Sequence, residues 1–512
     1  MASSITVAFA VAILLSFAAD RIAVPRAGFF RAWSALALHG VSVLFVACLM
    51  LALTRRPDFA AFVALALVAL VSAVSNAKYA SLREPFVFTD LSLFSQLFAH
   101  PRLYLPFLSV STVVAIALGV VALAGGFFAD KTLPAVAARD AAGGALACLA
   151  LGYLLAPRLR LTLDPLEDQR RHGFFAVFVA YLLNGMRPTT FRAFANAVSQ
   201  GPFAQEFDPP SRPDVIVIQS ESFFDPRTLT DKIALGLLPH FDEARRESLE
   251  HGTLSVPAWG ANTMRSEFAL LTGLPSSRLG YARFYPYAFV RRTCATLAGW
   301  FRRAGYRTIA VHPYYADFFG RDRAFPLLQF DRFLDIRAFE RASRAGPYVS
   351  DSAVLDRLIA LLDENRAQPA FLFAMTMENH GPLHLESVEP GEAEHYHALG
   401  EDPAWRDFTA YLRHIANADA MIGRLLAHLR ERRRDTILCF YGDHVPALPH
   451  VFERLGNVPG QSHYFIWRNF GDRPARKQDR AVEDLGAALL HAMGRAGGRG
   501  ASAGSSEKTA QL

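Results

Sequence analysis

Long apolar runs fill the first third of the chain, and short polar connections separate them. Five such runs can be drawn, at about 5–19, 33–53, 59–75, 103–128 and 141–156. A helix that crosses the hydrocarbon core of a bilayer needs about 17 to 25 residues. The first and last runs are at the short end of that range, so the pattern predicts about five membrane-spanning helices within residues 1–157. The first run lacks a basic n-region and is followed by Asp20-Arg21 rather than by a small-residue cleavage site, so we expect a retained helix and not a signal peptide.

A polar, proline-punctuated connector follows, over residues 158–212. It contains one aromatic apolar stretch, at 174–183, which is too short to cross a bilayer. Two interpretations remain open for this stretch. It is either an interfacial helix lying on the membrane surface or a buried helix of the soluble domain.

From residue 213 to about 490, short β-rich runs alternate with amphipathic helical stretches. The predicted strands are 215–219, 308–312, 371–377 and 436–441. Strands separated by helices predict a largely parallel sheet with helices on both faces, that is, an α/β domain. The last segment, 491–512, is rich in Gly, Ser and Ala, and we expect a disordered tail.

Composition supports this division of the chain. The sequence is 52% hydrophobic and 20% charged, whereas globular chains are about 45 to 50% apolar and about 25% charged. Because the excess apolar residues lie before residue 157, a wholly soluble enzyme is excluded. The net charge of +6 comes from 53 basic and 47 acidic residues that are interleaved, so no nucleic-acid partner is predicted. The four cysteines form no CxxC pair, so neither a disulfide framework nor a zinc knuckle is expected.

Candidate chemistry lies where predicted strands end, since ligands of open α/β sheets bind outside the carboxyl ends of the strands. The first strand leads into Glu221, and the strand at 436–441 leads into Asp443 and His444. Two carboxylates and an imidazole can form a divalent metal site. Taken alone, Asp-His after a strand is a weak signal, because it is more often a turn residue beside a surface histidine.

A third candidate is Thr263. The residues after Asn262 predict a helix that ends at Gly273. Thr263 would lie at the N-terminus of this helix, where backbone N–H groups and the helix dipole favour a phosphate. The alternative is a threonine that only caps the helix.

Four motifs in this order resemble the lipoteichoic acid synthase and phosphoglycerol transferase branch of the alkaline phosphatase and sulfatase superfamily. They are Gln-Ser-Glu-Ser-Phe-Phe-Asp around Glu221, Thr263 with Glu267-Phe268, Asn379-His380-Gly381-Pro382, and Tyr441-Gly442-Asp443-His444. The membrane part is similar too, through Asn76-Ala77-Lys78 and the stretch Arg83-Glu84-Pro85-Phe86-Val87-Phe88-Thr89-Asp90. The resemblance implies an alkaline-phosphatase-like (sulfatase-like) catalytic domain over about 213–490.

The resemblance also implies roles for individual residues. One divalent ion, Mn²⁺, Mg²⁺ or Zn²⁺, would be held by four of them: Glu221, Thr263, Asp443 and His444. Thr263 would be the nucleophile, and His380 and Arg321 would bind the transferred group. Phe319 stands where the family has a tryptophan, which removes an indole N–H donor. No Cys or Ser replaces Thr263, so an ordinary sulfatase is disfavoured. Two other histidines near predicted strands, His312 and His463, are left without a role.

The function implied is transfer of phosphoglycerol from phosphatidylglycerol to a periplasmic or cell-surface glycan through a phospho-threonine intermediate. Three alternatives stay open: a phosphoethanolamine transferase acting on a lipid or glycan, a phosphodiesterase, and a catalytically silent membrane protein that binds lipid or a partner. The complete set of four candidate ligands favours an enzyme over the silent protein.

The orientation in the membrane is predicted differently by charge and by resemblance. The first and third connections carry three basic residues each, and the second and fourth carry two each. This bias weakly favours a cytoplasmic C-terminal domain. The resemblance implies the opposite, a multi-pass protein of the cytoplasmic (inner) membrane with its catalytic domain on the periplasmic or extracellular side, and we follow it.

Overall fold

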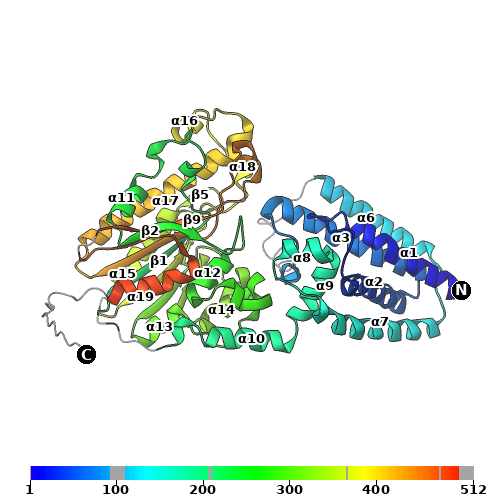
Figure 1. The fold of residues 1–512 in the computed structure, drawn as a ribbon. Helices are drawn as coiled ribbons and strands as arrows, with labels where there is room; N and C mark the ends of the chain where they lie inside the picture. Colours follow the sequence, from blue (N-terminus) through cyan, green and yellow to red (C-terminus); the bar gives the residue numbers. More distant parts are fainter. Residues whose placement is uncertain are drawn as a thin grey trace, which may run out of the picture.

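The structure is a computed structural model that describes residues 2–92, 110–205, 209, 211–364, 367–471 and 474–494. Figure 1 shows a bundle of helices on one side and a sheet covered by helices on the other, with α8 and α9 between them. The N-terminus lies at the outer end of the bundle. Most of the tail expected at 491–512 lies outside the described residues, but its first residues belong to helix α19 (Leu485–Gly494).

All five apolar runs contain helices: α1 (Ala2–Asp20), α2 (Trp33–Thr54), α3 (Pro57–Leu82), α6 (Val110–Ala129) and α7 (Ala135–Leu155). Three are long and apolar enough to cross a bilayer, namely α2, α3 and the stretch 135–158 that contains α7. The described apolar parts of the other two, Ile5–Asp20 and Ala117–Ala129, are shorter. The predicted helical membrane region is therefore confirmed, with three candidate spans among the five of its long helices that the structure describes.

The connections of the bundle lie at two opposite ends. At one end, the backbone N–H of Leu133, between α6 and α7, donates to the carbonyl of Arg55, between α2 and α3, over 2.7 Å. At the other end, the N–H of Gly28, between α1 and α2, donates to the carbonyl of Arg170 over 3.1 Å. Arg170 belongs to α8 (Pro165–His172), which leads toward the sheet domain. Successive helices thus run in opposite directions, as helices that cross a bilayer repeatedly must.

Helix α9 (Phe174–Gly185) contains the aromatic stretch of the connector. Its residues are mostly buried, and they belong to three different clusters of apolar side chains. Phe175 packs with the bundle, whereas Tyr181 stacks on Phe284 of the sheet domain with ring centroids 5.2 Å apart. α9 is therefore a buried helix that joins the two parts of the molecule. Helix α10 (Pro188–Ser199) then leads into the sheet domain.

The sheet has the strand order β10-β2-β9-β8-β1-β7-β3-β4, and β11 also pairs with β2. Its centre consists of the four predicted strands, which are β1 (Asp214–Ser220), β3 (Arg307–Val311), β7 (Ala370–Met375) and β8 (Thr436–Gly442). Neighbours from β8 through β4 (Arg332–Leu334) are parallel, and only β9 (Ser462–Arg468) runs antiparallel to its neighbours β8 and β2. The mostly parallel α/β sheet is confirmed. The remaining strands are β2 (Glu250–Ser255), β10 (Arg476–Lys477) and β11 (Arg480–Ala481), with a separate pair β5 (Arg344–Ala345) and β6 (Tyr348–Val349).

Alternate residues of β1 enter different cores, because successive side chains of a strand point to opposite faces. Val215 and Val217 join a cluster with α12 (Thr263–Thr272), α13 (Leu297–Arg303) and α19. Ile216 and Ile218 join a cluster with α11 (Pro239–Glu247), α15 (Asp351–Asp363) and α17 (Arg406–Glu431). Shorter helices complete the domain: α14 (Arg321–Leu327), α16 (Glu392–Tyr396) and α18 (Pro449–Leu455).

Candidate active site

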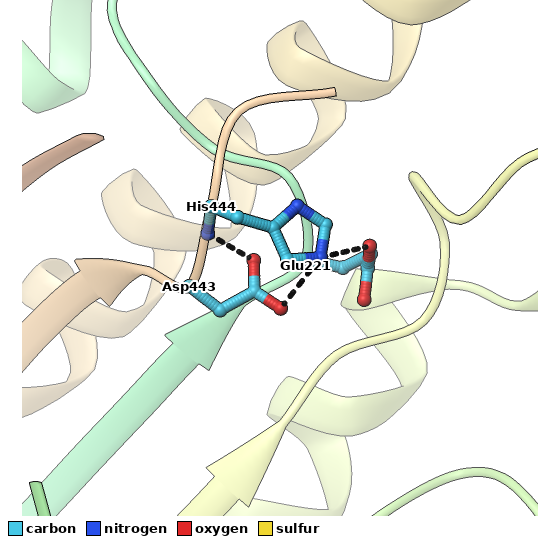
Figure 2. A group of neighbouring side chains, drawn as sticks. All are labelled: Glu221, Asp443 and His444. Atoms are coloured by element: carbon cyan, nitrogen blue, oxygen red, sulfur yellow. Dashed lines mark hydrogen bonds and ion pairs between the residues drawn. The ribbon is translucent and has the colours of Figure 1, made fainter. Parts of the chain in front are cut away.

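Three buried ligand-type side chains meet where β1 and β8 end. Ser220 at the end of β1 lies opposite Gly442 at the end of β8 in the parallel ladder. Glu221, Asp443 and His444 follow directly, so the register brings them to the same edge of the sheet. One ligand atom from each lies within 4.8 Å of the others, and all three residues are buried. Figure 2 shows the two carboxylates converging on the imidazole ring.

The donor set fits a divalent cation. His444 Nε2 lies 3.7 Å from Glu221 Oε1 and 3.5 Å from Asp443 Oδ2. Asp443 Oδ2 is buried with no hydrogen-bond partner among the described residues, which leaves it available as a ligand. Burial and the neighbouring Glu221 carboxylate raise the pKa of Asp443 to about 7. A bound cation would lower this pKa again, because it favours the charged carboxylate.

The imidazole ring of His444 is also oriented to bind a cation. His444 Nδ1 lies 3.0 Å from the carbonyl oxygen of Val445. Since a carbonyl only accepts hydrogen bonds, Nδ1 carries a proton and Nε2 faces the cluster, where a bound cation would take the place of an Nε2 proton. A carbonyl on the far nitrogen is the usual support of a metal-binding histidine.

Thr263 borders this cluster. It is the first residue of α12, and its Oγ1 lies 3.4 Å from His444 Nε2. The N-cap position belongs to Asn262, which has a left-handed backbone with φ of 68° and makes no side-chain cap. Thr263 is therefore not the residue that caps the helix, and its hydroxyl faces the cluster. The loop before α12 is tied to the loop after β8, because Gly260 N donates to Val445 O over 3.0 Å. Helix α12 itself is tied to the same loop, because Ser266 Oγ donates to Asp443 O over 2.6 Å.

Arg321, the first residue of α14, is fully buried beside α12. Its Nη2 lies 2.8 Å from Glu267 Oε2, and its Nη1 lies 3.3 Å from His312 Nε2. Burial, Arg321 and His380 all lower the pKa of His312 well below its usual value, so the ring is neutral. The sequence left His312 without a role, although it directly follows the strand β3. The Phe319 ring lies over the guanidinium, 5.3 Å from its carbon, and takes the place of the family tryptophan.

His380 lies in the loop that follows β7. Its Nδ1 is 2.7 Å from the carbonyl oxygen of Gly381 and 3.3 Å from the hydroxyl of Tyr348. The hydroxyl of Tyr348 donates to the same Gly381 carbonyl over 2.9 Å. His463 has a different place, since its Nδ1 accepts the backbone N–H of Asp225 over 3.0 Å and it is not among the clustered ligands.

A buried ionic group that the sequence did not predict supports the His380 loop. His414 of α17 lies between two carboxylates, with Nδ1 3.0 Å from Glu378 Oε1 and Nε2 2.8 Å from Glu386 Oε2. Glu378 Oε2 also accepts the backbone N–H of Asp351 over 2.6 Å. The 3- and 4-residue periodicity of α17 predicted its apolar face but gave no signal for a buried imidazole. The four cysteines are all free and buried, as expected.

Comparison with known families decides the identity of this domain. Residues 213–495 match the family model described as Sulfatase. The chain belongs to the sulfatase family. With its candidate membrane spans, this makes it a membrane-anchored enzyme of the alkaline phosphatase and sulfatase superfamily.

Two curated relatives come from Rhizobium meliloti (strain 1021). The capsular polysaccharide biosynthesis protein RkpI is 28% identical over 86% of this chain and 84% of its own length. A candidate cyclic beta-1,2-glucan modification protein is 30% identical over 58% of this chain, and the match spans 46% of that relative. Among solved structures, the lipooligosaccharide phosphoethanolamine transferase A (EptA) of Neisseria meningitidis is similar over 95% of both chains, with a TM-score of 0.56 and 14% identity. That likeness shows that the fold is shared along nearly the whole chain.

Proposed function

We propose that this sulfatase-family protein transfers phosphoglycerol from phosphatidylglycerol to a glycan. The observation that carries the proposal is the position of Thr263. Its hydroxyl lies at the start of α12 and 3.4 Å from His444, at the edge of the Glu221, Asp443 and His444 cluster. A hydroxyl at a helix N-terminus beside metal ligands is suited to attack phosphorus, since the helix N–H groups favour the phosphate that must lie there.

The reaction has two steps. In the first, Thr263 Oγ1 attacks the phosphorus of the lipid diester, the bond from phosphorus to the diacylglycerol oxygen breaks, and the phosphoglycerol remains esterified to Thr263. In the second, a hydroxyl of the acceptor attacks the same phosphorus and Thr263 leaves. A divalent cation held by Glu221, Thr263, Asp443 and His444 would make the threonine hydroxyl more acidic and would offset charge on the phosphoryl oxygens.

The neighbourhood of His380 supports glycerol as the head group. Hydrogen-bonding side chains lie close together in this part of the site, namely His312, Tyr348 and His380. Hydroxyls and imidazoles can bond both hydroxyls of glycerol. The motifs around Glu221, Thr263 and Asp443 favour the same branch of the family.

A glycan acceptor is supported by the relatives, both of which are named for polysaccharides or glucans. Membrane helices suit a donor that is itself a lipid, because enzyme and donor then share one bilayer. Such acceptors lie outside the cytoplasm, so we place the catalytic domain on the periplasmic or extracellular face of the cytoplasmic membrane.

The test uses the purified full chain in phosphatidylglycerol vesicles, with Mn²⁺, Mg²⁺ or Zn²⁺ and a cyclic beta-1,2-glucan as acceptor. Mass spectrometry should find phosphoglycerol on the glucan and diacylglycerol in the vesicles. Transfer only from phosphatidylethanolamine vesicles would replace the proposal with phosphoethanolamine transfer. Release of glycerol phosphate with an unmodified glucan would identify a phosphodiesterase, and no reaction with either lipid would reject an enzyme of this class.

A further inference from the structure

The segment that follows α3 is anchored to the membrane helix and reaches the sheet domain. Lys78 Nζ of α3 lies 2.6 Å from Asp90 Oδ2, and the N–H of Val87 donates to the same oxygen over 2.8 Å. The N–H of Phe86 donates to Ser75 Oγ over 3.1 Å. Residues 83–92, which we name the docking loop, are thus fixed to the last turns of α3.

The docking loop contacts the residues on both sides of Thr263. Before it, the Arg83 guanidinium carbon lies 4.9 Å from the centre of the Trp259 ring. After it, Glu84 forms a two-pronged ion pair with Arg265, with distances of 3.0 Å and 3.1 Å between the paired nitrogen and oxygen atoms. Trp259 and Arg265 therefore lie on either side of the short stretch that contains the proposed nucleophile.

The ion pair is largely shielded from solvent, since the Glu84 side chain is 17% exposed. Arg265 is 9% exposed, and its Nε also donates to the carbonyl of Phe284 over 3.0 Å. Burial raises the pKa of Glu84, but the charges of Arg265 and Lys78 outweigh that effect and bring it to about 2. Glu84 is thus a carboxylate at every pH at which the protein would work. Because two hydrogen bonds join the planar guanidinium to the carboxylate, the pair fixes the orientation of Arg265 relative to Glu84 as well as the distance between them.

A small shift of residues 259–265 would change the position of Thr263 and so the reaction rate. Gly260, which precedes Asn262 and Thr263, has a φ of 71° and bonds to Val445 next to His444. A Cβ at Gly260 would lie 3.4 Å from Leu82 Cδ2, so the end of α3 packs closely on the same turn. Misplacement of a reacting group by about 1 Å can cost about 100-fold in rate.

We propose that Glu84 is a positioning residue, through which the membrane region holds the start of α12 and thereby Thr263 in register with the metal cluster. The inference rests on the proposed role of Thr263 as nucleophile. Among the described residues, the side chain of Glu84 pairs with Arg265 and Lys78 rather than with the candidate metal ligands, so Glu84 acts through Arg265. The membrane region is then part of the catalytic apparatus as well as an anchor.

The first experiment measures turnover by the full chain in phosphatidylglycerol vesicles with Mn²⁺. Glu84→Gln should lower kcat about 10- to 100-fold with little change in KM, because the substrate contacts are kept. Glu84→Asp, which restores the charge, should recover most of the loss. The control is Glu167→Gln on α8, whose ion pair with Arg171 is exposed at 41% and 58% of the two side chains. A wild-type kcat in Glu84→Gln would overturn the proposal, and so would a loss that only follows the folded fraction.

The second experiment does not depend on activity. Hydrogen–deuterium exchange of the backbone in residues 259–267 should accelerate in Glu84→Gln and stay unchanged in Glu167→Gln. Unchanged exchange in both variants would overturn the positioning role. Accelerated exchange in a protein that shows no turnover of any lipid would instead reject the proposed function and keep the structural coupling. If Glu84→Gln does not fold, Arg83→Ala, which removes the contact with Trp259, is measured in the same way with the same two outcomes.

Discussion

Arg321 and Glu267 form an ion pair that is shielded from water, with Nη2 and Oε2 2.8 Å apart and side chains that are 1% and 0% exposed. Glu267 is also the acceptor of a hydrogen bond from the Tyr287 hydroxyl. The arginine that sequence resemblance assigns to the phosphate is therefore held by α12, the helix that begins at Thr263. In the proposed mechanism, this pair would link the binding of the phosphate by Arg321 to the position of Thr263.

Removal of the Glu267 carboxylate should destabilise the folded protein. Glu267→Gln leaves the guanidinium of Arg321 buried without a counter-charge, and we expect a loss of about 3 to 5 kcal/mol in the free energy of unfolding. Thermal and denaturant unfolding of the detergent-solubilised protein measure it. Glu431→Gln, at the exposed end of α17, is the matched control and should change stability by less than about 0.5 kcal/mol. Equal stability of Glu267→Gln and wild type would show that the pair is not needed to hold Arg321.

Thr263→Ala should abolish transfer while the protein stays folded. Thr263 is an early helical residue and not the cap, and alanine has the highest helix propensity, so the fold loses little. Thr263→Ser keeps a hydroxyl and should retain part of the activity. The measurement is phosphoglycerol transfer at equal amounts of folded protein, with Thr230→Ala in a surface loop as the control. Turnover in Thr263→Ala at the wild-type rate is incompatible with a covalent phospho-threonine.

A chelator should stop the reaction, and Mn²⁺, Mg²⁺ or Zn²⁺ should restore it. An ion that binds only the folded protein also stabilises it, so the melting temperature should rise when the metal is added. Asp443→Asn should lose that rise, because it weakens the site with the free Oδ2. Asp356→Asn, whose side chain is 63% exposed, should keep it. Full activity after chelation, or an unchanged melting temperature in the wild type, would remove Glu221, Asp443 and His444 from their proposed role.

The central strands and the apolar helices could be predicted from the sequence because their signals are local. Continuous apolar runs predict buried strands such as β1 and β7, and the periodicity of α17 predicts an amphipathic helix. The position of Glu221 beside Asp443 also follows, since parallel strands end at the same edge of a sheet. Short edge strands such as β10 and β11 have two residues each and carry no such pattern.

Contacts between distant polar residues could not be predicted in this way. The pairing of Glu84 with Arg265 joins residues that are 181 positions apart. His414 of α17 likewise contacts Glu378, which lies in the loop after β7. Buried charges of this kind look like ordinary surface residues in a sequence, because charge is usually solvated. The same limit applies to His312, whose role becomes visible only when Arg321 lies beside it.

The stability of the protein should fall as pH rises above neutrality, through His414. Burial lowers the pKa of His414, but the carboxylates of Glu378 and Glu386 outweigh it and raise the pKa to about 9. A raised pKa means that folding favours the protonated ring. The contribution is therefore complete below the unfolded value of about 6.5 and is lost as pH rises through about 9. Arg413, which pairs with Glu386 over 2.7 Å, keeps its charge throughout this range.

The measurement compares the melting temperatures of wild type and His414→Gln between pH 6 and pH 10. The wild type should be more stable at about pH 6 to 7, since it keeps the buried pair, and the difference should shrink toward pH 10. His395→Gln, which changes an exposed histidine of α16, is the control. A difference that is the same at every pH would mean that His414 is neutral in the folded protein.

The last prediction concerns the membrane orientation, where the charge bias and the proposed function disagree. The connection around Arg55 contacts Leu133 at one end of the bundle, and the connection around Gly28 contacts α8 at the end that leads to the sheet domain. If all five apolar helices cross the membrane, residues 55–56 and 130–134 lie on the opposite side from the catalytic domain. The difference between the two sides is one basic residue per connection, which is a weak bias.

Two fusion sites decide the orientation. Alkaline phosphatase fused after Gly494 should be active, because that enzyme needs the periplasm, and a fluorescent reporter that folds only in the cytoplasm should stay dark there. The same fluorescent reporter fused after Asp130, between α6 and α7, should be bright. Fluorescence after Gly494 with an active phosphatase after Asp130 would mean an inverted protein, and would separate the catalytic domain from any glycan outside the cell. Equal behaviour at both sites would mean that α7 does not cross the membrane, since α7 lies between them.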